Sequence, residues 1–220
     1  METLKYVYNL DRRFFGLLLL WFVTVSVLSF TLPKQESFLL INSLNHPAAD
    51  YFFAGVTQLA DGLFIVILGI VFLFRSKLRR LGIAILVTYT LSGLICATLK
   101  RYFANPRPAS VLNHVPEFHD VSWMPMAYQN SFPSGHTTSI FAAATTVALL
   151  GRNRRWSVIA LGIACLAAYS RVYLAQHFVE DLWFGTLIGT GIAIICYLAY
   201  RAVLILSAIS TDWTWPSLRV

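Results

Sequence analysis

Three short clusters of polar residues interrupt an otherwise apolar chain, and together they offer imidazole, carboxylate, guanidinium and ammonium groups. In chain order the clusters are Lys100 with Arg107 and Pro108, then Pro133, Ser134, Gly135 and His136, then Ser170 and Arg171 with His177 and Asp181. Groups of these types can bind a phosphate group through cations and attack it through an imidazole. The spacing within each cluster indicates which of these roles it can fill.

The third cluster contains a histidine and an aspartate four residues apart. On a helix, His177 and Asp181 share one face, so the carboxylate can hold one ring nitrogen as N–H and leave the other free to attack or to accept a proton. Arg171 lies six residues earlier, about 240° away on a continuous helix. We therefore expect one helix to end near Tyr173 and His177 to open the next. The alternative is a His–Asp pair that only fixes a turn.

The second cluster has the composition of a helix start. Serine is a favoured N-cap residue, as Ser134 would be, and Gly135 lets a ligand approach the backbone closely. The exposed N–H groups of a helix N terminus bind phosphate readily. His136 would lie in the first turn, next to the bound anion. The alternative is that His136 is a polar residue at a membrane interface.

The first cluster supplies positive charge. Arg107 offers a planar fork for phosphate oxygens and Lys100 a mobile point charge. With Arg171, these residues could hold a phosphate monoester, which carries roughly −1.5 to −2 charges near neutral pH. The alternative for Lys100 and Arg101 is that both extend toward lipid headgroups at the end of a membrane helix, which explains Arg101 better than Lys100.

Outside these clusters, the chain has the composition of a membrane protein. Hydrophobic residues make up 57% and charged residues 12%, against about 25% charged residues in a soluble domain. Six stretches approach the roughly 20 apolar residues that a membrane helix needs. They are Phe14–Leu32, Tyr51–Phe74, Leu81–Leu99, the stretch from Ser134 to Leu150, Trp156–Tyr173 and Leu182–Leu206. The sequence therefore predicts an all-α fold: one domain over residues 1–220, built as a bundle of six transmembrane helices.

The distribution of basic residues predicts the orientation of this bundle. Twelve of the 17 basic residues fall on one face of it, which the positive-inside rule assigns to the cytoplasm. They are Lys5, Arg12, Arg13, Arg75, Lys77, Arg79, Arg80, Arg152, Arg154, Arg155, Arg201 and Arg219. Both termini would then be cytoplasmic, and the three polar clusters would lie at the outer ends of the helices. The net charge of +7 in so apolar a chain favours an anionic lipid surface as partner rather than nucleic acid.

Four further features lie outside the clusters. Residues 33–50 are too short and mixed to span a membrane and are expected to lie at its interface. Asp61, inside the second apolar stretch, either pairs with a basic residue of the site or faces the interface. Gly185 and Gly189 are spaced for close helix packing. The long segment 109–132 is expected to cover the active site.

Metal binding is not expected. His114 and His119 lie in the 109–132 segment beside two acidic residues, but their spacing matches no metal motif. The three cysteines fall in apolar stretches, where packing roles are expected. The three cations of the site would carry out the charge neutralisation that a metal ion otherwise provides.

Together the clusters resemble the signature of the type 2 phosphatidic acid phosphatase superfamily: Lys-x6-Arg-Pro, Pro-Ser-Gly-His and Ser-Arg-x5-His-x3-Asp. Every fixed position is present and in order between Lys100 and Asp181. The resemblance implies that His177 attacks phosphorus to form a phosphohistidine, that Asp181 orients it, and that His136 protonates the leaving oxygen. It also implies the residues that bind the phosphoryl group: Lys100, Arg107, Arg171, Ser134 and Gly135, with support from Ser170. No cofactor is implied.

The resemblance implies a lipid phosphatase of the bacterial cytoplasmic (inner) membrane, with a periplasmic or extracellular site and no obligate protein partner. A polyprenyl diphosphate and lipid A 1-phosphate are the expected substrates, which the sequence does not separate. A phosphotransferase would use the same site with a second lipid as acceptor. A transporter or channel would use the basic residues as an anion path, but no inverted repeat or pair of broken helices supports one. A silent scaffold would have no use for His136, His177 and Asp181.

Overall fold

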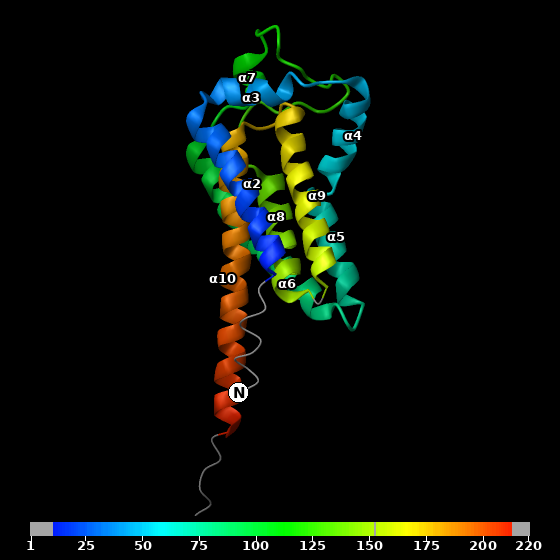
Figure 1. Cartoon of the computed structure of the whole chain (residues 1–220), viewed down its shortest axis with the longest axis vertical. Helices are drawn as coiled ribbons and strands as arrows, with labels where there is room; N and C mark the ends of the chain where they lie inside the picture. Colours follow the sequence, from blue (N-terminus) through cyan, green and yellow to red (C-terminus); the bar gives the residue numbers. More distant parts are fainter. Residues whose placement is uncertain (1–10, 152, 213–220) are drawn as a thin grey trace, which may run out of the picture.

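The computed structural model describes residues 11–151 and 153–212, and within them every regular element is a helix (Figure 1). The helices are α2 (Arg12–Thr31), α3 (Lys34–Asn42), α4 (Pro47–Gln58), α5 (Gly62–Leu73), α6 (Arg79–Phe103), α7 (Pro108–Leu112), α8 (Gly135–Leu150), α9 (Arg154–Tyr173) and α10 (Val179–Asp212). The longer helices run between two ends of the molecule, and the short helices α3 and α7 lie across the upper end in Figure 1. The predicted all-α class is confirmed for this part of the chain.

Most of the predicted membrane helices meet the length and hydropathy expected of a span. Among the described residues, α2, α6, α9 and α10 do so individually, and α4 with α5 does so as one bent pair. Helix α8 has 16 residues, fewer than the roughly 20 that a typical span requires. Four to five spans are therefore supported by composition, and the sixth stays a prediction.

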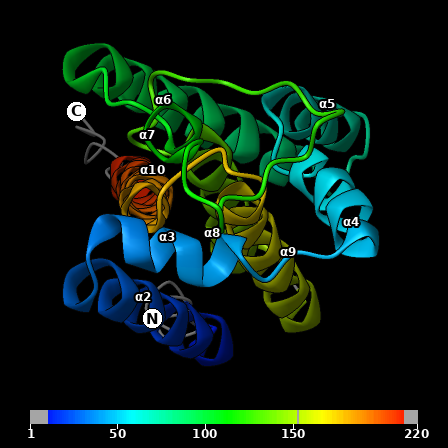
Figure 2. The same cartoon turned by 90° about the horizontal axis from the view of Figure 1, so that it is seen from above.

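Helix α8 is the central helix of the bundle. It packs against α10, α6, α9 and α5, and Figure 2 shows it enclosed by α10, α6 and α9 when seen from above. Its residues 137–146 are buried almost without interruption. Because other helices shield it from lipid, α8 can be short and rich in threonine and alanine.

Two glycines let α10 approach α8 at backbone distance. A Cβ atom at Gly185 would lie 2.9 Å from the carbonyl oxygen of Ser134, and one at Gly189 would lie 2.3 Å from that of Thr138. At the upper end of the same contact, the Ser134 N–H donates to the Asp181 carbonyl oxygen at 3.1 Å. The packing role predicted for the two glycines is confirmed, and it holds the starts of α8 and α10 together.

The second apolar stretch is not the single straight helix that the sequence predicts. Helix α4 ends at Gln58, α5 begins at Gly62, and their axes differ by 49°. The Asp61 carboxylate accepts the Leu63 N–H at 2.8 Å and so caps α5. A short polar side chain that bonds to the backbone competes with helix continuation, which explains the break in an otherwise apolar run.

The ends of the helices group the basic residues as the sequence predicts. The lower end of the molecule in Figure 1, opposite α3 and α7, contains the start of α2. The connections from α5 to α6 and from α8 to α9 lie at the same end. These positions carry most of the basic residues assigned to the cytoplasmic face; Lys5, Arg152 and Arg219 lie outside the described residues. The orientation in a membrane stays a prediction.

The α8–α10 contact predicts the effect of adding one methyl group. Gly189→Ala should lower the melting temperature of the detergent-solubilised protein, because the new Cβ would meet Thr138 O at 2.3 Å and Ala142 N at 2.9 Å. Overpacking of this kind costs about 1–3 kcal/mol. Gly191→Ala is the matched control on the same helix, since nothing lies within 4 Å of its Cβ position. Equal melting temperatures for the two variants would contradict the close contact.

Candidate active site

His177 and Asp181 form a buried pair at the junction between α9 and α10. The His177 Nδ1 atom lies 3.3 Å from Asp181 Oδ2, and the two residues are 1% and 0% exposed. The same carboxylate oxygen accepts the Ser131 hydroxyl at 2.5 Å and the Phe178 N–H at 3.0 Å. With Nδ1–H directed at this fixed carboxylate, Nε2 carries the free lone pair of the imidazole.

A tight turn separates Arg171 from His177, as the sequence predicts. Helix α9 ends at Tyr173, and Ala175 takes a left-handed conformation with φ of 55°. The N–H groups of Gln176 and His177 both bond to the Arg171 carbonyl oxygen, at 2.9 and 3.1 Å. Helix α10 begins at Val179, so His177 precedes its first turn and Asp181 lies within that turn.

The surroundings of His177 favour its neutral form. Burial lowers the pKa of the imidazole well below its ordinary value, and the positive charges of Arg107, Arg171 and Lys100 lower it further. A neutral imidazole retains the lone pair that a nucleophile requires. The three cations whose charges act on this histidine lie on three different segments of the chain.

Arg171 is a buried cation with spare hydrogen-bonding capacity. It is 7% exposed, and one terminal nitrogen donates to the Thr57 hydroxyl at 2.6 Å. Its Nε atom is buried and has no hydrogen-bond partner among the described residues. A buried donor without a partner costs free energy, so an anion that accepts this N–H would bind favourably.

Arg107 and Lys100 are held by neutral oxygen atoms. Arg107 donates through Nε to the Gln129 carbonyl at 2.9 Å and through a terminal nitrogen to Gln176 Oε1 at 2.9 Å. Lys100 Nζ donates to the Asn130 carbonyl at 2.6 Å. Because these acceptors carry no formal charge, they do not neutralise either side chain.

The start of α8 has the predicted cap. The Ser134 hydroxyl accepts the Thr137 N–H at 3.3 Å and the Thr137 hydroxyl at 2.9 Å. Gly135 lies beside Lys100, whose Cε would be 3.9 Å from a Cβ at that position. His136 follows in the first turn, and its Nε2 atom lies 3.9 Å from Asp61 Oδ2. The N terminus of α8 therefore adds its positive dipole end to the three cations.

Ser170 is a buried residue near the end of α9. Its hydroxyl donates to the Ala167 carbonyl of its own helix at 2.6 Å, and the residue is fully buried. Ser170 thus lies next to Arg171 in the chain, and the supporting role that the resemblance implies for it stays a prediction.

Several contacts of the site involve residues that the three clusters do not include. The Ser131 hydroxyl donates to Asp181. Gln176 accepts a hydrogen bond from Arg107, and Thr57 accepts one from Arg171. Ser131 and Gln176 lie within two residues of a cluster, which is the only signal that the sequence offers for them. Thr57 lies over a hundred residues from its partner and carries no such signal.

The segment 109–132 lies over the upper end of the bundle (Figure 1). The Gln176 side chain donates to the Pro125 carbonyl at 3.3 Å. His119 contacts Asp50 at 3.0 Å, and Asp50 also accepts the Tyr173 hydroxyl at 2.6 Å. This histidine therefore anchors the segment to α4 and α9. No group of three or more potential metal ligands occurs among residues 11–151 and 153–212.

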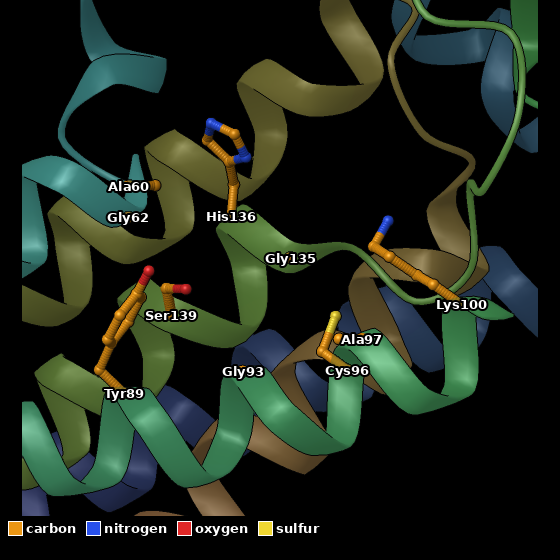
Figure 3. A pocket seen from close by; sticks show the side chains of 10 residues that line it. All are labelled: Ala60, Gly62, Tyr89, Gly93, Cys96, Ala97, Lys100, Gly135, His136 and Ser139. Atoms are coloured by element: carbon orange, nitrogen blue, oxygen red, sulfur yellow. The ribbon is translucent and has the colours of Figure 1, made fainter.

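A cavity of about 250 Å³ opens beside His136 and Lys100. It lies between α6, α8 and the α4–α5 break, as Figure 3 shows. Small residues line much of it: Ala60, Gly62, Gly93 and Ala97. The cavity therefore adjoins the polar site through His136 and Lys100, and small residues form much of the rest of its lining.

Comparisons with known proteins find similar sequences and a similar structure. The model of the PAP2 superfamily matches residues 81–204, which is more than half of the chain. A lipid A 4′-phosphatase from Porphyromonas gingivalis is 30% identical over 76% of this chain and 72% of its own length. An undecaprenyl-diphosphatase from Sulfolobus acidocaldarius is 27% identical, over 55% of this chain and 56% of its own. The crystal structure of Aquifex aeolicus LpxE superimposes with a TM-score of 0.65 and 31% identity, covering 74% of this chain and 93% of that one.

Two neighbouring basic residues provide a test of the site. Lys100→Gln should weaken the binding of inorganic phosphate to the purified protein about tenfold or more, because a charge-assisted hydrogen bond contributes roughly 1.5–3 kcal/mol. Arg101→Gln removes the same charge from an exposed position and should leave the affinity unchanged. Calorimetry gives both dissociation constants. Equal losses would indicate general charge attraction rather than a defined site.

Proposed function

Because this chain belongs to the PAP2 superfamily, whose members are phosphatases of lipid phosphates and diphosphates, we propose that it removes a terminal phosphate from a membrane lipid through a phosphohistidine intermediate. The candidate substrates are a polyprenyl diphosphate and phosphorylated lipid A. The nucleophile is His177, and no metal ion takes part.

One observation carries this proposal: a buried imidazole, held by a carboxylate, lies within the influence of three cations, none of which forms an ion pair with a carboxylate among residues 11–151 and 153–212. His177 is held at Nδ1 by Asp181, and the charges of Lys100, Arg107 and Arg171 act upon it. A tetrahedral dianion fits this combination, because the cations neutralise its oxygens while the imidazole approaches phosphorus.

In the first half of the reaction, His177 Nε2 forms a bond to phosphorus as the bond from phosphorus to the lipid oxygen breaks. His136 donates a proton to that oxygen, so the lipid leaves as a neutral alcohol, or as a monophosphate when the substrate is a diphosphate. Asp181 stabilises the positive charge that develops on the His177 ring. Lys100, Arg107 and Arg171 stabilise the negative charge on the three transferring oxygens.

In the second half, a water molecule attacks the phosphohistidine. His136, now neutral, accepts a proton from the water as the phosphorus–nitrogen bond breaks. Inorganic phosphate leaves and His177 returns to its neutral form. A phosphotransferase would differ only in this half, with a lipid hydroxyl in place of water.

The surroundings of the site support a lipid as the substrate. The polar groups lie at one end of a bundle of apolar helices, and small residues line much of the cavity beside His136. We propose six membrane passages, counting the α4–α5 pair and the buried α8, with the basic end of the bundle in the cytoplasm and the site on the opposite side. A lipid headgroup would then reach the site from the outer leaflet of the inner membrane.

A labelled substrate tests the intermediate. Brief reaction with a lipid phosphate carrying radioactive phosphorus should label the wild-type protein through an acid-labile, base-stable bond, and His177→Ala should abolish the label. Phosphate release should fall about a thousandfold or more in that variant and should survive EDTA in the wild type. His114→Ala is the control, because this histidine is exposed in the covering segment. Full turnover by His177→Ala would sink the assignment of the nucleophile.

Filling the cavity tests its role in lipid binding. A leucine at position 93 would project into the cavity, since nothing lies within 4 Å of the Cβ position of Gly93. Gly93→Leu should raise KM for a long-chain lipid phosphate about tenfold or more, with little change in kcat/KM for a small water-soluble phosphate ester.

Gly162→Leu is the control for the cavity, because Gly162 is exposed on α9 and its Cβ position is also open. Parallel losses on the lipid and on the small ester would show that Gly93→Leu damages the site itself.

A further inference from the structure

The break between α4 and α5 brings two side chains against the active site. Thr57, one residue before the end of α4, accepts a hydrogen bond from Arg171. Asp61, the N-cap of α5, faces His136. Residues 57–61 lie outside the stretch that matches the family model. Residues four apart share one face of a continuous helix, and the 49° break after Gln58 in addition leaves the Asp61 side chain free to cap α5.

The two carboxylate oxygens of Asp61 face different partners. Oδ1 accepts the Leu63 N–H at 2.8 Å and fixes the side chain to the backbone of α5. Oδ2 is left to face His136 Nε2 at 3.9 Å. Hydrogen bonds of an active site are often long in the free enzyme and tighten when the substrate binds. The cap thus anchors a carboxylate in front of a specific ring nitrogen.

The other charged groups around His136 are positive or become positive during the reaction. Arg171 on α9, Arg107 before α7, Lys100 on α6 and the His177 imidazole all act upon its ring. Each of them opposes the protonated form of His136, yet a proton donor must hold its proton until the leaving oxygen takes it. Among the described ion pairs, Asp61 is the carboxylate that faces this ring.

We propose that Asp61 is a positioning residue for His136, which rests on the function proposed above. Its carboxylate holds Nε2–H and supports the protonated ring, so that the other ring nitrogen delivers its proton to the leaving oxygen as the phosphorus–oxygen bond breaks. The electron pair of that bond goes to the leaving oxygen, and His136 becomes neutral. The hydrogen bond from Arg171 to Thr57 joins the end of α4 to α9, which keeps Asp61 at a fixed distance from the site.

Asp61→Asn separates this role from that of the helix cap. Asparagine caps helices about as well as aspartate, so α5 should stay intact while the negative charge is lost. The measurement is kcat of the purified, full-length protein on two soluble substrates, octyl phosphate and 4-nitrophenyl phosphate. The alkoxide leaving group needs a proton, whereas 4-nitrophenolate leaves without one.

We expect Asp61→Asn to lower kcat for octyl phosphate about tenfold or more, within the range that a proton donor contributes, and to change kcat for 4-nitrophenyl phosphate less than twofold. His136→Ala should show the same preference, and the double variant should lose little more than His136→Ala alone. Asp11→Asn, at the N-cap of α2 far from the site, should affect neither substrate.

Equal losses on both substrates, or additive losses in the double variant, would overturn the role of Asp61 while leaving the phosphatase intact. No hydrolysis of either substrate by the wild type would instead overturn the proposed function, and this inference with it.

Discussion

The structure depends on holding three positively charged side chains close to one another in a region of low polarity. Lys100, Arg107 and Arg171 converge on His177, and the N terminus of α8 adds a further positive end. Neighbouring cations repel each other more strongly where water is excluded. The protein offsets this with carbonyl, amide and hydroxyl oxygens from Gln129, Asn130, Gln176 and Thr57. These oxygens solvate the cations without neutralising them, so the positive charge is reserved for an anion.

The rest of the bundle keeps that arrangement in place. Each cation lies on a different segment. Lys100 on α6 and Arg171 on α9 can both act on His177 only because the packing of the helices fixes their relative positions. The backbone contact of Gly185 and Gly189 with α8 joins the start of α8 to the start of α10. The turn at Ala175 then directs His177 back over Arg171. Rigid packing along the apolar helices thus determines where the few polar groups lie.

The sequence predicted what is local and missed what depends on tertiary contacts. The end of α9 near Tyr173, the cap at Ser134 and the close α8–α10 packing follow from helical spacing and residue type, and the structure has all three. The break at Asp61 was missed because an apolar run of sufficient length predicts one span, although an aspartate followed by glycine is itself a helix-start signal. The partners of Arg171 and Arg107 come from remote or irregular segments, which no periodicity reveals.

The size of the cavity bears on how the protein distinguishes its substrates. At about 250 Å³ it is smaller than the roughly 300–1,000 Å³ of pockets that enclose a drug-sized ligand, and under the proposed function it would receive the part of a lipid next to its phosphate. The remaining chain must stay in the bilayer, where lipids of different tail offer similar apolar surfaces and little basis for discrimination. Selectivity would therefore rest on the first few atoms beyond the phosphate, which meet Ala60, Gly62 and Gly93. A polyprenyl diphosphate presents a second phosphate there and a lipid A phosphate presents a sugar ring. The width of the cavity and the position of Lys100 would separate these two groups better than any contact with the tail.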